Sequence, residues 1–289
     1  MIHVIAPSRI SLEVIKLSDP LSLEVVSRYP SKGKRCTPLL FVHGAFSAAW
    51  IWSEHFLDWF SERGWPVHAV SLRGHGGSEG HESLGQWGID NYVADVMQVI
   101  EEIGERPVLI GHSMGGFVVQ KCLEQSTFPA AVLMCSVPPS GLMASTISMA
   151  WSRPDLMGSL AQLMTGAPAD ANGFKEALLA QPVAISDLER YAALSQTESQ
   201  RAILDMTLLN LIRPNRLNPA PKLVIGAEMD HMVPANQVRE TAQTYGVEPV
   251  IFPDMGHALM LERDWAHVAS VLNDWLVAVV QDAPKPKSS

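Results

Sequence analysis

The chain has 289 residues, of which 47% are hydrophobic and 18% charged, so it can bury a large globular core. Its formal net charge is −9 and it has no basic cluster, which argues against a nucleic-acid partner or a polyphosphate ligand. No apolar run reaches the roughly 18 residues of a membrane span, and the N-terminus lacks the pattern of a signal peptide. We therefore expect a cytoplasmic protein.

The first half of the chain predicts strands that are separated by helices. Short apolar runs alternate with amphipathic helical patterns, and glycine or proline marks many of their ends. The first two predicted strands have no helix between them, so we expect them to pair as an antiparallel edge. The predicted elements are strands at 21–29 and 38–44, a helix at 50–64, a strand at 67–74, a helix at 89–104, a strand at 107–113 and a helix at 114–125.

The second half contains a long stretch with helical patterns alone, at 139–219. One of its helices begins with Ser186 and Glu189, which have the spacing of a capping box. The elements predicted after residue 129 are a strand at 130–139, helices at 154–164, 186–194 and 199–212, strands at 222–230 and 249–257, and a helix at 265–280.

Alternation of strands and helices forms βαβ units, so the chain is predicted to be an α/β protein with a mostly parallel, doubly wound sheet. The helical stretch should be inserted as a cap, or lid, over the carboxyl edge of that sheet. The expected division is a core of residues 1–138 and 220–281, a cap of residues 139–219 and a disordered tail of residues 282–289.

The residues Gly111-His112-Ser113-Met114-Gly115 fit the pattern G-x-S-x-G, at the junction of a predicted strand and a predicted helix. A nucleophile elbow requires this context. Its tight turn presents the serine in a strained backbone conformation, and the helix that follows points its N-terminal amides at the reacting centre. We therefore predict that Ser113 is a nucleophile.

A serine nucleophile needs a base, and the base needs a carboxylate that orients it. Asp230 and His257 follow Ser113 at the ends of two later predicted strands, in the chain order of such a triad. Glu228 and Asp254 are the rival carboxylates, but Glu228 lies within the turn before Asp230 and Asp254 lies very close to the histidine. We therefore assign the acid to Asp230 and the base to His257.

A tetrahedral intermediate needs preorganised donors for its oxyanion. The backbone N–H of Met114, the residue after the nucleophile, is expected to be one of them. The second is expected in the loop after the strand at 38–44, at Ala45 in the first place and otherwise at Phe46.

Substrate contacts are expected from Phe46 and His112 and from two methionines of the insertion, Met143 and Met149. The stretch 139–166 holds four methionines and only two charged residues. Methionine fills irregular apolar space and adapts to varied ligands, so this stretch favours an apolar acyl or aromatic pocket. Packing between the cap helices is the alternative explanation of the methionines.

Five motifs in order resemble the α/β-hydrolase superfamily. They are FVHG at 41–44, SLRGHGGSEG at 71–80, GHSMGG at 111–116, the aspartate of GAEMDHMVP at 226–234 and the histidine of DMGHALMLE at 254–262. The second and third are most similar to the monoglyceride-lipase and carboxylesterase branches, which implies a serine esterase with a variable helical cap. The resemblance also implies that His43 and the loop 73–78 support the oxyanion region, although turn geometry explains the glycines of that loop equally well.

The resemblance separates this chain from some branches. Epoxide hydrolases and haloalkane dehalogenases would carry an aspartate nucleophile where Ser113 stands, and carbon–carbon bond hydrolases often carry asparagine where His112 stands. We expect a carboxylic ester hydrolase that acts on a small-molecule ester. Cleavage of a carbon–carbon, amide or lactone bond, perhydrolysis, and a non-hydrolytic binding or signalling role stay open as alternatives.

No metal or cofactor is expected. The three cysteines, Cys36, Cys122 and Cys135, have the spacing of neither a disulfide framework nor a zinc site, so they are predicted to be buried apolar residues. The sequence leaves the oligomeric state open between a monomer and a homodimer.

Overall fold

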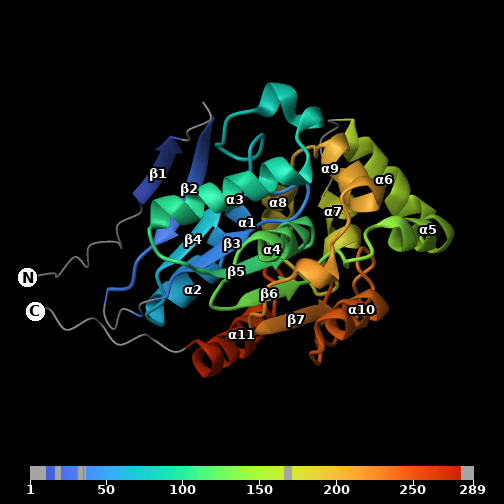
Figure 1. Cartoon of the computed structure of the whole chain (residues 1–289). Helices are drawn as coiled ribbons and strands as arrows, with labels where there is room; N and C mark the ends of the chain where they lie inside the picture. Colours follow the sequence, from blue (N-terminus) through green and yellow to red (C-terminus); the bar gives the residue numbers. More distant parts are fainter. Residues whose placement is uncertain (1–10, 17–20, 32–34, 36, 166–170, 281–289) are drawn as a thin grey trace, which may run out of the picture.

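The computed structural model describes residues 11–16, 21–31, 35, 37–165 and 171–280 (Figure 1). Within these residues eight strands form one sheet in the order β1-β2-β4-β3-β5-β6-β7-β8. The predicted tail at 282–289 and Cys36 lie outside the described residues. The strands are β1 (Ser11–Lys16), β2 (Ser22–Arg28), β3 (Leu39–Val42), β4 (Val67–Val70), β5 (Val108–His112), β6 (Ala131–Met134), β7 (Lys222–Ala227) and β8 (Val250–Phe252).

The sheet is mostly parallel, as predicted. Strands β3 to β8 run in one direction, whereas β2 pairs antiparallel with both β1 and β4. The prediction that the strands at 21–29 and 38–44 would pair with each other was wrong, because β4 lies between β2 and β3. Strand β1, which was not predicted, occupies the free side of β2 and forms the edge instead.

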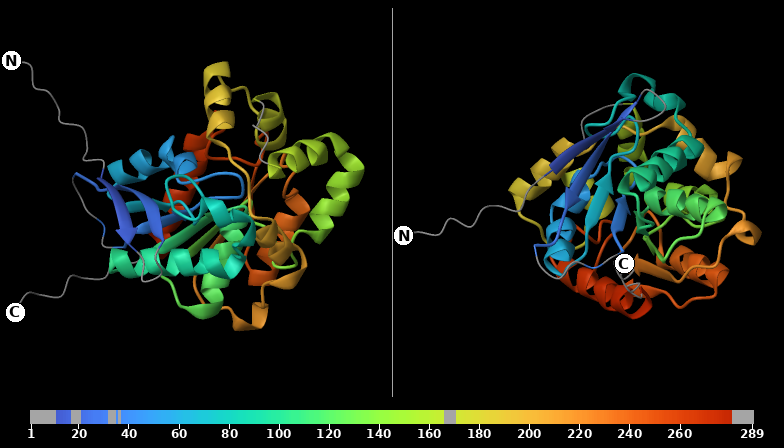
Figure 2. Two further views of the ribbon diagram at one scale, coloured as in Figure 1. Left: turned by 90° about the horizontal axis from the view of Figure 1, so that it is seen from above. Right: turned by 60° about the vertical axis from the view of Figure 1, so that its left-hand side comes forward.

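Helices cover both faces of the sheet, so its central strands bury side chains on both sides (Figure 2). In β3, Leu39 and Phe41 enter a core cluster with side chains of α2 (Phe56–Glu62) and α11 (Trp265–Val279). Leu40 and Val42 enter a second cluster with α3 (Ile89–Ile103) and α4 (Met114–Gln125). Pairing with β4 and β5 on its two sides sets the register of β3 and hence the position of the loop at its carboxyl end.

The helix predicted at 50–64 is two helices, α1 (Trp50–Ser53) and α2. His55 leaves the helical region with φ −143°, and its ring stacks on Trp265 with ring centroids 4.5 Å apart. The remaining elements of the core are the 3₁₀ turn η1 (His81–Gln86) and α10 (Ala235–Tyr245). In the described part of the chain no helix is long and apolar enough to cross a membrane.

Between β6 and β7 the chain forms a helical insertion (Figure 1). The capping box predicted at Ser186 was wrong, because that residue lies inside a helix that begins at Ile185. A side-chain cap is found instead at Ser199, whose Oγ accepts the N–H of Ala202 at 3.2 Å. The helices are α5 (Met143–Ser152), α6 (Pro154–Met164), α7 (Ala171–Leu178), α8 (Ile185–Leu194) and α9 (Gln200–Leu204), followed by the π-helical turn η2 (Asp205–Leu209) and the 3₁₀ turn η3 (Pro214–Arg216).

Candidate active site

Ser113 occupies a sharp turn between β5 and α4. Its backbone angles are φ 53° and ψ −119°, a combination that residues other than glycine rarely adopt. A Cβ on Gly115 would stand 2.3 Å from the His43 carbonyl oxygen, and one on Gly111 would stand 2.3 Å from that of Gly115. Glycine is therefore required at both positions, because β3, β5 and α4 meet directly beside the serine.

His257 and Asp230 form a buried pair in the loops that follow β8 and β7. The His257 Nδ1 lies 2.7 Å from the Asp230 Oδ2. An ionised carboxylate only accepts hydrogen bonds, so Nδ1 carries the hydrogen and Nε2 is left as the basic nitrogen. The other carboxylate oxygen accepts the backbone N–H groups of Met232 and Val233, each at 2.8 Å. These bonds fix the carboxylate, which in turn fixes the imidazole ring.

The rival carboxylates lie outside this pair. The side chains of Glu228 and Asp254 are exposed, whereas Asp230 is 4% exposed. The structure thus brings Asp230 to His257, and it places His257 and Ser113 on the wall of one cavity.

His112 holds the segment that carries His257. Its Nε2–H donates to the His257 carbonyl oxygen at 3.0 Å, and the two ring centroids are 4.6 Å apart. Burial, together with the neighbouring His257, lowers the pKa of His112 well below its ordinary value. The ring is therefore neutral, and its unprotonated Nδ1 has no hydrogen-bond partner in the described structure.

Glu262, which the sequence analysis missed, ties the His257 segment to the insertion. Its side chain is fully buried, and Oε1 accepts the N–H groups of Gly256 at 2.6 Å and Ala180 at 2.7 Å. Oε2 accepts the N–H of Gln181 at 3.0 Å. The signal in the sequence is a single acidic residue directly after the apolar run 258–261.

A cavity of about 140 Å³ lies beside Ser113, and Ala45, Phe46, His112 and His257 also border it. Most of its wall is apolar and comes from one helix of the core and two helices of the insertion. The side chains concerned are Trp50 and Ile51 of α1, Leu160 and Leu163 of α6, and Phe174 and Leu178 of α7.

Met143 and Met149 do not border this cavity, contrary to the prediction. Met143 is 45% exposed on α5, and Met149 is buried at 6% exposure on the same helix. The pattern predicted helices in this stretch, and the structure has them between β6 and β7, but a pattern does not tell which of several helices borders the cavity. The structure places α6 and α7 there instead.

The candidate oxyanion donors are held by the residues around them. In the described structure no hydrogen bond uses the backbone N–H of Ala45 or of Met114. The His43 Nε2 accepts the N–H of Leu72 at 3.0 Å, so His43 Nδ1 carries the hydrogen that it donates to the Gly44 carbonyl oxygen at 2.8 Å. Since N–H and C=O point in opposite directions across a trans peptide, this bond turns the Ala45 N–H away from His43.

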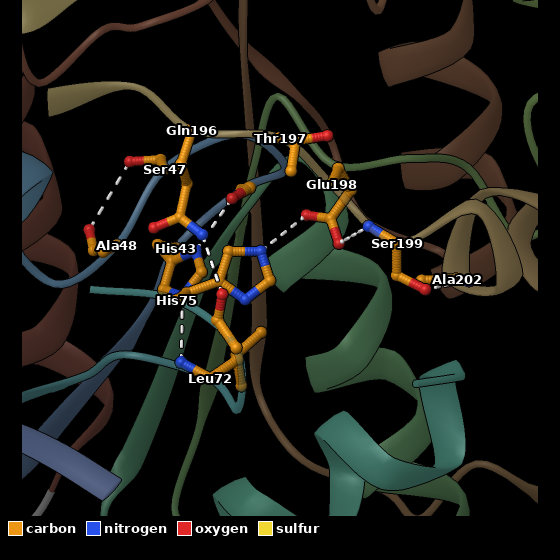
Figure 3. Close-up of polar contacts among 12 residues, drawn as sticks. His43, Ser47, Ala48, Leu72, His75, Gln196, Thr197, Glu198, Ser199 and Ala202 are labelled. Atoms are coloured by element: carbon orange, nitrogen blue, oxygen red, sulfur yellow. Dashed lines mark hydrogen bonds and ion pairs between the residues drawn. The ribbon is translucent and has the colours of Figure 1, made fainter. Parts of the chain in front are cut away.

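The loop 71–80, which follows β4, is held by buried charged groups rather than by turn geometry alone. Arg73 donates from Nε to Asp95 Oδ1 at 2.8 Å, and its backbone N–H donates to Oδ2 at 2.9 Å. His75 contacts Glu198 of the insertion, with 3.0 Å between Nε2 and Oε2 (Figure 3). Asp95 and Glu198 were not predicted as site residues, because their partners are distant in the sequence.

Cys135 is buried beside Asp230, and Cys122 is buried elsewhere in the core. Ligand atoms of Cys135, Asp230 and His257 lie within 4.8 Å of one another. Burial first, and then the charge of Asp230, raises the pKa of the Cys135 thiol well above its ordinary value. Because a metal ion binds the thiolate and not the thiol, this donor set does not favour a metal site.

Comparisons with known proteins identify relatives of the whole fold and of part of the sequence. The profile described as "Alpha/beta hydrolase family" matches residues 39–270. The chain is 32% identical to Epoxide hydrolase A of Mycobacterium tuberculosis over 102 residues, which are 35% of this chain and 31% of that protein. It is 28% identical to Epoxide hydrolase 1 of Caenorhabditis elegans over 130 residues, 43% of this chain and 31% of that protein. The matches thus span about a third of these relatives.

Solved structures resemble the chain over most of its length. The esterase EaEST from Exiguobacterium antarcticum superimposes with a TM-score of 0.75 at 17% identity, covering 91% of this chain and 98% of the esterase. The monoacylglycerol lipase of Paleococcus ferrophilus gives a TM-score of 0.65 at 20% identity, covering 89% of this chain and 98% of the lipase. At such identities the likeness concerns the fold alone. Because the family profile spans strands β3 to β8, the insertion, Ser113, Asp230 and His257, the chain belongs to the alpha/beta hydrolase family.

Proposed function

We propose that the protein is a serine hydrolase that cleaves carboxylic esters through an acyl-enzyme. The Ser113 Oγ attacks the ester carbonyl carbon while its proton passes to the His257 Nε2, and Asp230 stabilises the imidazolium that forms. The N–H groups of Ala45 and Met114 bind the oxyanion. His257 then protonates the leaving alcohol, and a water molecule activated by the same nitrogen releases the acid and restores Ser113.

The observation that carries this proposal is the buried 2.7 Å contact between His257 and Asp230, beside a cavity that Ser113 also borders. The contact defines which nitrogen of His257 is basic. The strained backbone of Ser113 supports the proposal further, because strain of this kind at a buried turn is typical of functional residues.

The cavity supports a substrate with a compact apolar acyl or aryl group. Cavities of roughly 150 Å³ with apolar walls take up benzene, and this one measures about 140 Å³. Among the described residues of its wall none is lysine, arginine, aspartate or glutamate. We therefore propose neutral esters whose acyl or aryl part has about six carbons.

A panel of p-nitrophenyl esters tests the reaction. The wild-type protein should hydrolyse them, and Ser113→Ala should lower kcat by roughly 10⁴-fold to 10⁶-fold without changing the fold, because the members of a triad act as a unit. A fluorophosphonate should label the wild type at Ser113 and leave the alanine variant unlabelled. Labelling at another residue, or near-normal turnover by the variant, would show that Ser113 is not the nucleophile.

The assignment of the acid is tested by a matched pair of variants. Asp230→Asn should keep the shape of the side chain but lose the orientation of the His257 ring, lowering kcat by up to about 10⁴-fold. Asp254→Asn, which changes an exposed aspartate three residues before the histidine, should leave kcat within about twofold of the wild type. The opposite ranking would assign the acid to Asp254.

The sequence relatives raise epoxide hydrolysis as a second candidate function. The nucleophile argues against it. A carboxylate that opens an epoxide forms an ester, which water then hydrolyses, whereas a serine would form an ether that the same site cannot hydrolyse. Styrene oxide, added to the panel, should yield no diol above the uncatalysed background; enzymatic diol formation would favour the second candidate.

A further inference from the structure

The segment 195–199, between α8 and α9, connects the insertion to two loops of the core; we call it the cap segment. Figure 3 shows Gln196, Thr197 and Glu198 of this segment above His43 and His75. One of the two loops is 44–47, here called the oxyanion loop, which holds the proposed donor Ala45. The other is the loop 71–80.

Gln196 bonds both loops at once. Its backbone N–H donates to the Phe46 carbonyl oxygen at 3.0 Å. Its side-chain Nε2 donates to the Gly74 carbonyl oxygen at 2.8 Å, and its Oε1 accepts the Gly76 N–H at 2.9 Å. Phe46 has a φ of 64°, so the bond to Gln196 stabilises an unfavourable backbone conformation in the oxyanion loop.

Glu198 anchors the cap segment beneath Gln196. The side chains of Glu198 and His75 are both 0% exposed, and the His75 Nδ1 lies 3.1 Å from the Arg73 carbonyl oxygen. Since that carbonyl and the Glu198 carboxylate only accept, both nitrogens of His75 carry hydrogens and the ring is an imidazolium. The Tyr92 hydroxyl donates to Glu198 at 2.8 Å, which satisfies the second carboxylate oxygen.

The imidazolium of His75 acts on the oxyanion loop through His43. The two ring centroids are 5.0 Å apart. Burial first, and then the charge of His75, lowers the pKa of His43 to about 3. His43 therefore stays neutral, with one N–H directed at the Gly44 carbonyl oxygen and one nitrogen that accepts from Leu72. A buried ion pair adds little stability over apolar side chains of the same volume, but its directional bonds favour one geometry.

We propose that Gln196 is a positioning residue for the oxyanion hole. Its side-chain bonds to Gly74 and Gly76, together with the Glu198–His75 pair, hold its backbone in place. Its backbone N–H then fixes the Phe46 carbonyl from the insertion side, while His43 fixes the Gly44 carbonyl from the core side. The two bonds together keep the Ala45 N–H where the oxyanion develops. This inference rests on the proposed ester hydrolysis, and it makes the insertion part of the catalytic geometry as well as a wall of the cavity.

The test compares Gln196→Ala with Thr197→Ala as the matched control. Thr197 is the next residue, and its hydroxyl donates to the Met164 carbonyl oxygen of α6 at 3.2 Å, away from both loops. Gln196→Ala keeps the backbone N–H that bonds Phe46 but removes the side-chain bonds to Gly74 and Gly76 that hold this N–H in place. It should lower kcat by about 10-fold to 100-fold and leave KM within about threefold, because a displacement of the oxyanion donor by about 1 Å weakens binding of the transition state more than binding of the substrate. Affinity for a boronic acid, whose tetrahedral adduct uses the same donors, should fall by a similar factor. Thr197→Ala should match the wild type in all three quantities.

Hydrogen exchange supplies a readout that does not depend on the reaction. The amide of residue 196, which donates to the Phe46 carbonyl oxygen, should exchange faster in Gln196→Ala than in the wild type or in Thr197→Ala. If the wild type hydrolyses no ester but this difference is present, the proposed function fails and the positioning by Gln196 stands. If the two variants have the same kcat and the same exchange rates, the inference is overturned.

Discussion

Ser113 keeps its strained conformation because the residues around it leave no alternative path for the chain. Its N–H donates to the Met134 carbonyl oxygen at 3.0 Å, and its carbonyl oxygen accepts from Phe117 and Val137. Because Gly111 and Gly115 have no Cβ, neighbouring backbone segments occupy the space that a Cβ would need at each position. Strain at one residue is thus offset by hydrogen bonds from β6, α4 and the chain after β6.

Gly115→Ala tests this close approach, with Gly158→Ala as the matched control. The new Cβ at position 115 would meet backbone oxygens of His43 at 2.3 Å and Val42 at 2.4 Å, so the free energy of unfolding should fall by at least about 2 kcal/mol. Gly158 is exposed within α6, and no heavy atom lies within 4 Å of its Cβ position. Alanine there should raise the free energy of unfolding by about 0.5 kcal/mol. Urea unfolding measures the free energy of both variants, and equal changes in the two would show that the close approach at Gly115 does not require glycine.

The meeting of Ser113, Asp230 and His257 beside one cavity could be predicted from the sequence, whereas contacts between residues with distant partners could not. Ser113, Asp230 and His257 each follow a strand, and parallel strands bring their carboxyl ends to one edge. Glu198 and Glu262 accept from groups such as His75, 123 positions away, and Gln181, 81 positions away. No local pattern distinguishes such a glutamate from one on a solvated surface.

At the scale of elements, the cap segment and the loop after β4 are joined by a buried ion pair with a defined pH range. Burial alone would lower the pKa of His75, but the charge and hydrogen bond of Glu198 raise it above its ordinary value of 6.5. Burial alone would raise the pKa of Glu198, but the charge and hydrogen bond of His75 lower it below 4.5. The other titratable or charged groups facing His75 are Asp95 and Tyr92 of α3, His43 after β3 and Arg73 of the same loop.

Glu198→Gln should therefore destabilise the protein in a pH-dependent way. The charge of His75 contributes fully to the free energy of unfolding below pH 6.5, and this contribution is lost as the pH rises through its raised folded pKa. The charge of Glu198 contributes fully above pH 4.5, and its contribution is lost only as the pH falls through its lowered folded pKa. Between pH 4.5 and 6.5 the variant should unfold with about 3 kcal/mol less free energy than the wild type. Urea unfolding at pH 5.5 and at pH 9 should show the difference narrowing at the higher pH.

Asp58→Asn is the control for this pH dependence, since it removes the exposed partner of a surface ion pair with Arg28. The Asp58 side chain is 59% exposed, so the substitution should change the free energy of unfolding by less than about 1 kcal/mol at either pH. A difference for Glu198→Gln that is the same at both pH values would show that the pair is not ionised in the folded protein.

The type of most elements could be predicted, but their pairing and exact ends could not. Periodicity identified β3 to β8 and the long helices α3, α4 and α11, since buried strands and amphipathic helices have distinct apolar spacings. The split at His55 depends on a tertiary contact, the stacking on Trp265, which the local pattern does not contain. The position of β2 depends on its pairing with β4, which is distant in the sequence and which no local pattern predicts.

At the scale of the whole molecule, two buried glutamates attach the insertion to the core at two separate places beside the candidate site. Glu262 of the core accepts from Ala180 and Gln181 of the insertion, next to His257. Glu198 of the insertion pairs with His75 of the core, next to the oxyanion loop. The first attachment follows directly after α7, which together with α6 lines the cavity, and the second adjoins the oxyanion loop on the same cavity.

The volume of the cavity should therefore set the preferred length of the substrate. Each methylene that enters the apolar cavity contributes up to about 0.8 kcal/mol, so kcat/KM should rise several-fold for every two carbons of a linear acyl chain. The rise should stop near six carbons, because the cavity measures about 140 Å³. Kinetics with p-nitrophenyl esters from acetate to decanoate measure this profile.

Leu163→Ala should move the optimum to a longer chain by about two carbons, because it removes part of the wall that α6 contributes. Met143→Ala is the matched control, since this exposed side chain of α5 does not border the cavity, and its profile should match that of the wild type. A shift with Met143→Ala and none with Leu163→Ala would place α5 rather than α6 over the substrate. A flat profile in the wild type would show that the insertion does not select the acyl chain by volume.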